Sequence, residues 1–235
     1  MNFKTHCTAF LPTALIQVYR NIKRKFSSFQ NRSPKEVFTH IYHTNRWGSA
    51  ESVSGAGSEL RHTERLIKSL NELFQQLGIR SILDLPCGDF NWMQQVTLEG
   101  INYLGADIVE PLIAQNQATF RHLPQVRFEV LDLLTDPLPQ VDLVVVRDCL
   151  VHFSFPNIQM ALKNIKHSGS TYLLATTFTQ LSRNKDIITG EWRPVNLQLE
   201  PFLLPPPMLL IAEQLDTTDK ILQSKALGLW RVEDL

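Results

Sequence analysis

The sequence has little cysteine, no acidic residue near its start and no long apolar run. Its three cysteines, Cys7, Cys87 and Cys149, are an odd number and lie far apart. A disulfide framework is therefore not expected, and a reducing, cytoplasmic compartment fits better. No apolar run reaches the roughly 18–20 residues that a membrane helix requires. The ten glycines follow no period and 43% of the residues are hydrophobic, which excludes collagen and a wholly disordered chain.

Charge is unevenly distributed, although basic and acidic residues both number 23. Residues 1–35 contain seven basic residues and no acid, which leaves 16 basic and 23 acidic residues in 36–235. We expect a basic N-terminal arm, residues 1–32, on an acidic body, and the balanced total argues against a general nucleic-acid binder. Apolar spacing over 13–26 predicts an amphipathic helix. Peripheral membrane contact, organelle targeting and a solvated arm all remain open for it.

Two helices and a loop are expected before the first strand. The sequence S-P-K-E from Ser33 combines a capping serine, a proline at the first helical position and a capping-box glutamate, which predicts a helix over 33–42. Residues 45–58 contain three glycines and four serines and are typical of a loop. Ser58 is expected to cap a second, longer helix that Gly78 ends.

From residue 81 onward, short apolar runs alternate with helical segments. Such alternation predicts an α/β fold with a doubly wound sheet, and nearly continuous apolar runs suit strands covered on both faces. The last two strand candidates suit a closing antiparallel pair, so we expect seven strands, the last antiparallel. The expected strands are 81–85, 103–107, 126–132, 141–147, 171–177, 208–212 and 227–232, and the helices between them are 91–96, 111–120 and 156–167.

The segment after the first strand, S-I-L-D-L-P-C-G-D-F from Ser81, resembles the first motif of the class I S-adenosylmethionine-dependent methyltransferases. Asp84 occupies the acid position of that motif and Gly88 its central glycine. Asp107 matches the acid that binds the ribose hydroxyls, and Asp132 matches the residue beside the adenine. The resemblance implies a Rossmann-like domain with S-adenosyl-L-methionine as cofactor, bound by Asp84, Pro86, Cys87, Gly88, Asp107, Ile108, Asp132, Leu133 and Arg147.

Two residues depart from that motif. Pro86 and Phe90 stand where its first and third glycines are usual, so we expect them to reshape the floor of the pocket. A nicotinamide dehydrogenase is the chief competitor, but it requires G-x-G-x-x-G after the first strand, and only one of those glycines is present. The segments I-Y-H-T-N-R-W-G and N-L-Q-L-E-P-F resemble a little-described bacterial branch of the methyltransferases.

Residues outside these motifs complete the expected site. Asp148 and His152, four positions apart after the fourth strand, are the catalytic candidates, since a His–Asp pair can deprotonate an acceptor near neutral pH. Each also has a structural interpretation, as a turn cap and a packed histidine. Cys149-x-x-His152 lacks a second ligand pair, so zinc is not expected. Trp47, Ser54 and Gly55 are expected to fold over the cofactor as a lid. The expected substrate residues are Asp89, Asn91, Trp92, Arg193 and Asn196.

We therefore divide the chain into the basic arm 1–32, a helical cap and Gly/Ser-rich loop 33–57, and a class I methyltransferase domain 58–235. The expected reaction is methyl transfer to an oxygen or nitrogen of a small-molecule acceptor. Two alternatives remain: a methyltransferase fold kept as a binding or assembly module without turnover, and an RNA methyltransferase that uses the arm as its electrostatic footprint. The acidic body speaks against the second.

Overall fold

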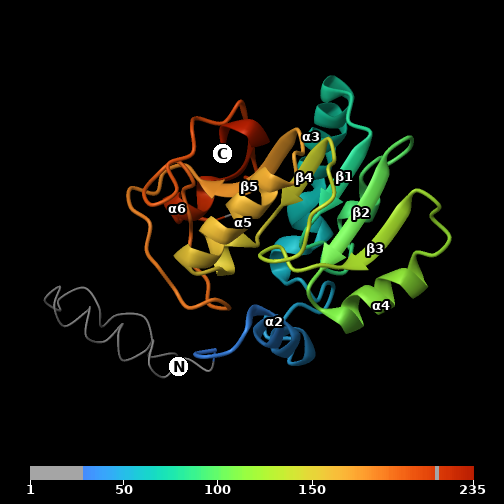
Figure 1. Ribbon diagram of the computed structural model, residues 1–235, viewed down its shortest axis with the longest axis horizontal. Helices are drawn as coiled ribbons and strands as arrows, with labels where there is room; N and C mark the ends of the chain where they lie inside the picture. Colours follow the sequence, from blue (N-terminus) through green and yellow to red (C-terminus); the bar gives the residue numbers. More distant parts are fainter. Residues whose placement is uncertain (1–28, 215–216) are drawn as a thin grey trace, which may run out of the picture.

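The computed structural model describes residues 29–214 and 217–235. The helix expected over 13–26 lies outside the described residues. The fold is an α/β sandwich around a seven-stranded sheet of order β3-β2-β1-β4-β5-β7-β6 (Figure 1). Its strands are β1 (Ser81–Asp84), β2 (Asn102–Asp107), β3 (Val126–Val130), β4 (Leu143–Val146), β5 (Tyr172–Phe178), β6 (Leu209–Ala212) and β7 (Lys225–Arg231).

The expected α/β class, strand number and closing antiparallel pair are confirmed. Strands β1 to β5 pair in parallel, and β7 is antiparallel to both β5 and β6. Each strand begins or ends within two residues of its expected position. The central strand β4 is wholly buried because helices cover both faces of the sheet, and such burial explains its unbroken apolar run.

Two apolar clusters lie on opposite faces of the sheet. Helix α3 (Leu60–Leu77) supplies Leu66, Leu70 and Phe74 to one cluster. Helix α5 (Phe155–His167) supplies Ile158 and Ile165 to the other. The other α-helices of the described residues are α2 (Pro34–His43), α4 (Glu110–Thr119) and the single-turn α6 (Lys220–Gln223). Within the described residues, no helix is long and apolar enough to cross a membrane.

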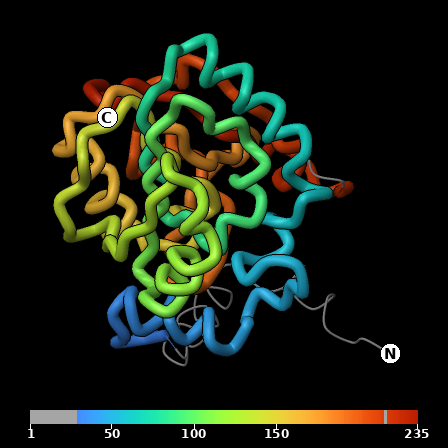
Figure 2. The backbone as a smooth tube through the Cα atoms, turned by 90° about the vertical axis from the view of Figure 1, so that its right-hand side faces the viewer, coloured from blue at the N-terminus to red at the C-terminus, as the bar shows by residue number. Residues whose placement is uncertain are grey.

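Helix α2 forms as the sequence predicts. The Ser33 hydroxyl accepts a hydrogen bond from the Glu36 amide (3.3 Å), and the Glu36 carboxylate accepts one from the Ser33 amide (2.8 Å). This reciprocal capping box fixes the start of the helix. The helix lies beyond the carboxyl ends of β1 to β3 in Figure 1, and Figure 2 shows the chain continuing from it, blue to cyan, up to α3.

Two expectations near the Gly/Ser-rich loop are wrong. Residues 91–96 do not form a helix but a 3-10 turn, Met93–Gln95, because the polar groups of the preceding turn bond to the loop and its apolar side chains enter the core. Ser58 does not cap α3, since it lies one residue too early, in a 3-10 turn of its own. The Glu51 carboxylate instead accepts from the first amide of that helix, at Leu60 (2.7 Å).

Candidate active site

A cavity lies at the carboxyl ends of β1, β2 and β4, the place where ligands bind in open α/β sheets. It comprises about 1050 Å³, including space open to solvent. The loops after β1 to β4 form its floor, and α2 and the Gly/Ser-rich loop cover it. Its walls are mainly apolar and aromatic, as in most small-molecule sites. Lining residues from the covering segments are Pro34, Phe38, Tyr42, Trp47, Val53, Ser54 and Ser58.

Gly88 brings the loop after β1 close to the covering loop. Its φ is +56°, and a Cβ atom there would stand 2.0 Å from the Ser54 hydroxyl oxygen, so no other residue fits without displacing the loop. The Gly88 amide donates to Asp107 (3.3 Å), and its carbonyl accepts from Asn116 (2.7 Å). These bonds hold the backbone of this turn against the end of β2.

Phe90 does not reshape the cavity floor, contrary to expectation. Its side chain is buried among Tyr103, Phe120 and Phe128 and is absent from the residues that line the cavity. A positive φ of 60° at Phe90 turns the chain so that the ring enters the core. Pro86 does line the cavity.

Two buried carboxylates stand at the ends of the central strands. Asp84 ends β1 and accepts a hydrogen bond from the Tyr103 hydroxyl (2.6 Å), while burial raises its pKa to about 7. Asp107 ends β2 and accepts from the Val109 amide (3.0 Å). Burial raises the pKa of Asp107 to about 6, although its backbone hydrogen bonds oppose the shift. Ile108, Asp132 and Leu133 complete this side of the cavity.

Asp89 organises the Gly/Ser-rich loop. Its carboxylate accepts from the Ser52 hydroxyl and the Val53 amide, both at 2.9 Å. Asn91 donates to the Glu51 carboxylate (2.9 Å) and to the Ser58 carbonyl (3.1 Å). These two residues therefore hold the covering loop in place. They do not line the cavity, where the sequence placed substrate.

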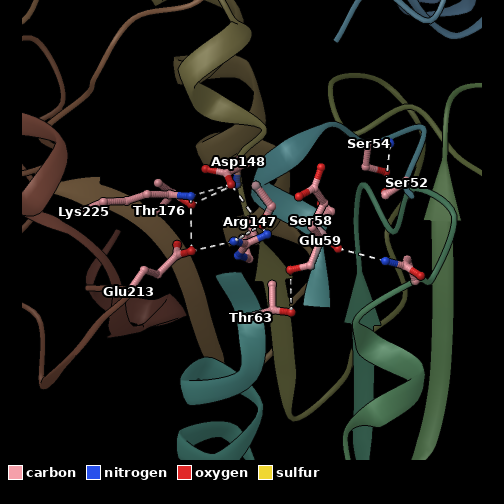
Figure 3. Close-up of polar contacts among 12 residues, drawn as sticks. Ser52, Ser54, Ser58, Glu59, Thr63, Arg147, Asp148, Thr176, Glu213 and Lys225 are labelled. Atoms are coloured by element: carbon pink, nitrogen blue, oxygen red, sulfur yellow. Dashed lines mark hydrogen bonds and ion pairs between the residues drawn. The ribbon is translucent and has the colours of Figure 1, made fainter. Parts of the chain in front are cut away.

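Four charged side chains from three strand ends form a buried ion network (Figure 3). Arg147 and Asp148 follow β4, Glu213 follows β6 and Lys225 begins β7. Arg147 pairs with Glu213 (2.5 Å), and Lys225 pairs with Asp148 (2.6 Å) and Glu213 (3.2 Å). Burial alone would raise the pKa of Asp148, but the charges of Lys225 and Arg147 outweigh it and lower this pKa to about 2. Asp148 is therefore ionised at any physiological pH.

His152 lines the cavity beneath Trp47, whose ring centroid lies 5.2 Å away. Its Nδ1 lies 3.0 Å from the Glu191 carbonyl oxygen. A carbonyl only accepts, so Nδ1 carries the proton and Nε2 keeps its lone pair. Burial lowers the pKa of His152, with partial opposition from this hydrogen bond and from Asp148. The structure forms no hydrogen bond between these two described residues, His152 and Asp148, so the expected pair is not made.

The comparisons agree with this architecture. Residues 82–168 match the model of a family described as a methyltransferase domain. This stretch of the chain is similar to a methyltransferase domain. No curated protein sequence is significantly similar to the chain.

In the part of the chain that the structure describes, no three His, Cys, Asp or Glu side chains group as metal ligands.

Two solved methyltransferases share this fold. Human N-acetylserotonin methyltransferase, solved with S-adenosylmethionine, is 17% identical over 85% of this chain and 59% of its own, with a TM-score of 0.55. Magnesium protoporphyrin IX methyltransferase from Synechocystis, also solved with that cofactor, is 16% identical over 68% of this chain and 82% of its own, with a TM-score of 0.51. The chain thus spans about three fifths of the human enzyme.

The fold brings most of the sequence-predicted residues to the lining of one cavity, and it leaves five outside that lining. Arg193 lies outside the lining, and its buried guanidinium donates to the Leu150, Phe153 and Lys185 carbonyls. Asn196 also lies outside the lining, where its backbone amide and carbonyl bond to the Asn184 side chain. Gly55 lies under Trp47 and outside the lining, as do Asp89 and Asn91. Those in the lining are Trp47, Ser54, Asp84, Pro86, Cys87, Gly88, Trp92, Asp107, Ile108, Asp132, Leu133, Arg147, Asp148 and His152.

Sequence reasoning missed the two partners of the ion network that lie far along the chain. Glu213 directly follows the apolar run of β6, and Lys225 directly precedes that of β7. A charge at the end of an apolar strand was the signal available for both. That signal could be interpreted only with the sheet order known, because the sheet brings β6 and β7 to the side of β5 and β4.

Proposed function

We propose that the chain is an S-adenosylmethionine-dependent methyltransferase that acts on an oxygen or nitrogen atom of a small-molecule acceptor. The observation that carries this proposal is the position of Asp107, a carboxylate at the end of β2 that lines the cavity beside the Gly88 backbone. A carboxylate has two oxygens that can accept from two neighbouring hydroxyls, as a ribose requires.

The residues present fit the cofactor. Asp107 would bind the ribose, and Ile108 would contact one face of the adenine. Asp132 and Leu133 would contact an edge of the adenine. Gly88 lets Ser54 of the covering loop come close to the turn after β1, because a side chain at this position would collide with the Ser54 hydroxyl. The four carboxylates that line the cavity, Asp84, Asp107, Asp132 and Asp148, suit a cofactor that carries a positive charge and no phosphate.

When bound, the cofactor supplies a methyl group on a positively charged sulfur; the acceptor lone pair forms the new bond and the S–C electron pair remains on sulfur. The residues of this chain then align the acceptor and take its proton. We assign proton acceptance to Nε2 of His152, since Nδ1 is committed to the Glu191 carbonyl. Asp148 is too acidic for that task, so its role is electrostatic.

Calorimetric titration with S-adenosylmethionine tests the cofactor assignment. We expect the wild-type protein to bind S-adenosylmethionine and not to bind NAD. Asp107→Asn should weaken binding about tenfold or more, because hydrogen bonds to a charged partner are lost. Glu129→Gln, which removes a carboxylate from an exposed position of β3, should bind like the wild type. Equal affinity of Asp107→Asn and wild type would remove the main support for the proposal.

A second test concerns His152. His152→Gln keeps a polar side chain but removes the base, so methyl transfer from labelled cofactor to a library of small phenols, alcohols and amines should fall by about 10²–10⁴. Cofactor affinity should stay unchanged. In the wild type, the acid limb of the rate profile should lie below pH 6.5, because burial lowers the pKa of His152 from that value. A wild-type rate in the variant would refute the assignment.

A further inference from the structure

The sheet order divides the cavity into two halves. Asp107 and Asp132 follow β2 and β3 on one side of β1, whereas Asp148 and His152 follow β4 on the other. In the proposed function, on which this inference rests, the adenosine occupies the β2–β3 half. The β4 half is then available to the acceptor. Arg147, Asp148 and His152 line this half, and so do the aromatic residues Phe38, Trp47 and Phe153.

The position of Asp148 is fixed from several directions. Its backbone adopts a positive φ of 52°, uncommon outside glycine. Its amide donates to the Thr176 hydroxyl (2.8 Å). One carboxylate oxygen, Oδ2, receives Lys225 (2.6 Å) and lies 3.5 Å from Arg147. The side chain nevertheless retains 28% of its exposure and lines the cavity, so part of this carboxylate faces a ligand.

The cations of the network are buried and pair with its carboxylates. The side chains of Arg147 and Lys225 are only 4% and 7% exposed, and both pair with the fully buried Glu213. Among the described residues that line the cavity, Arg147 is the only permanent cation and is paired with Glu213, whereas four residues there carry carboxyl groups. An anionic acceptor would therefore meet repulsion without a free counter-charge.

We propose that the methyl acceptor carries a protonated amine, which Asp148 receives, and an apolar or aromatic body. The body would pack against Phe38, Trp47 and Phe153, and the nucleophile would face His152. Trp47 strengthens the preference for a cation, because an ammonium group is attracted to an indole face. The Lys225–Glu213 pair acts through Asp148: it holds one oxygen of the carboxylate and leaves the other for the acceptor.

The test uses the full chain saturated with S-adenosylhomocysteine, the binding of which is first measured by calorimetry. Ligand-observed NMR then compares a panel of aralkyl amines, tyramine among them, with the carboxylate and the uncharged alcohol of the same carbon skeleton. We expect amines to bind about tenfold or more tightly than their carboxylate partners, as for a hydrogen bond between charged groups. If no amine binds better than its carboxylate partner, the proposal is overturned.

Asp148→Asn should abolish the preference and leave binding of the uncharged alcohols unchanged. The preference overturns the proposal if it persists in this variant. Should the single variant not fold, Asp148→Asn with Lys225→Met removes one charge of each sign and keeps the Arg147–Glu213 pair balanced. Glu129→Gln is the control for a lost carboxylate elsewhere.

The cofactor also carries an ammonium group. A further experiment therefore distinguishes whether Asp148 binds the ammonium group of the acceptor or that of the cofactor. Weaker binding of S-adenosylhomocysteine by Asp148→Asn, with unchanged binding of methylthioadenosine, would assign the carboxylate to the cofactor and overturn the proposal. A wild-type protein that binds no S-adenosylhomocysteine would instead refute the proposed function. The amine panel, measured without S-adenosylhomocysteine, would still show whether the protein binds amines more tightly than their carboxylate partners.

Discussion

Gly88 and Gly78 have similar left-handed backbones, with φ values of +56° and +64°, but different surroundings. A Cβ atom at Gly78 would meet nothing within 4 Å, whereas one at Gly88 would stand 2.0 Å from the Ser54 hydroxyl oxygen. We expect Gly78→Ala to lower the free energy of unfolding by about 1 kcal/mol through backbone strain alone. Gly88→Ala should lower it further and should also weaken cofactor binding, because the covering loop is displaced.

Urea denaturation and calorimetry with S-adenosylhomocysteine measure the two effects. Adding Ser54→Gly to Gly88→Ala removes the colliding hydroxyl and should restore part of the lost stability, and the same change in Gly78→Ala should restore none. Identical stability and affinity of the two alanine variants would show that the close approach at Gly88 is unimportant.

The site residues differ in how far the sequence could reveal them. Asp84, Gly88, Asp107 and Asp132 directly end strands or follow them, so local pattern and resemblance sufficed to place them at the cavity. Arg193 lies in an irregular Pro-rich segment, where the sequence pattern does not predict which way a side chain points. Its guanidinium binds main-chain carbonyls instead. The partners of the ion network come from strands separated by more than sixty residues, a relation that only the folded sheet supplies.

At the scale of elements, α2 links the capping box to the cover of the cavity. Ser33→Ala removes the side-chain cap and should cost about 1 kcal/mol of helix stability. Since Phe38 and Tyr42 of this helix line the cavity, S-adenosylhomocysteine should dissociate faster. Lys35→Met is the comparison: it breaks an ion pair with Glu110 between half-exposed side chains, which contributes little. Stopped-flow release should separate the two variants, and equal rates would contradict a covering role for α2.

The strands could be predicted because one sequence signal, the apolar run, dominates in each of them. The strands are apolar runs bounded by turn residues, and burial on both faces leaves little else for them to form. The segment 91–96 was mispredicted because helical spacing competes with tertiary contacts. Trp92 and Met93 are buried, and Asn91 is committed to the Gly/Ser-rich loop. Local spacing cannot register that competition.

At the scale of the whole molecule, the interior carries several ionised groups that the fold must balance. The ion network holds two cations and two anions, and it bridges the ends of β4, β6 and β7. Removing one member leaves the buried network with an unbalanced charge, which usually destabilises more than removing a pair. Asp84 has no such partner at hydrogen-bond distance, since it accepts only from Tyr103 among the described residues.

Asp84 should therefore make stability depend on pH. Its pKa is about 7 in the folded protein, against an ordinary value of 3.8. Between these values the unfolded chain is ionised while the folded protein retains the proton. The free energy of unfolding then falls by about 1.4 kcal/mol per pH unit as pH rises, and the loss ends above pH 7. The cost of the buried charge is absent below pH 4 and complete above pH 7.

Asp84→Asn removes that charge and keeps an acceptor for the Tyr103 hydroxyl. We expect its stability relative to wild type to rise with pH by about 4 kcal/mol between pH 4 and pH 8, and urea titrations at each pH measure this difference. Glu129→Gln, at an exposed position of β3, is the control and should give a nearly flat difference. An equally flat difference for Asp84→Asn would mean that Asp84 is not buried as a charge, and the cavity floor would then be more open to water than the structure describes.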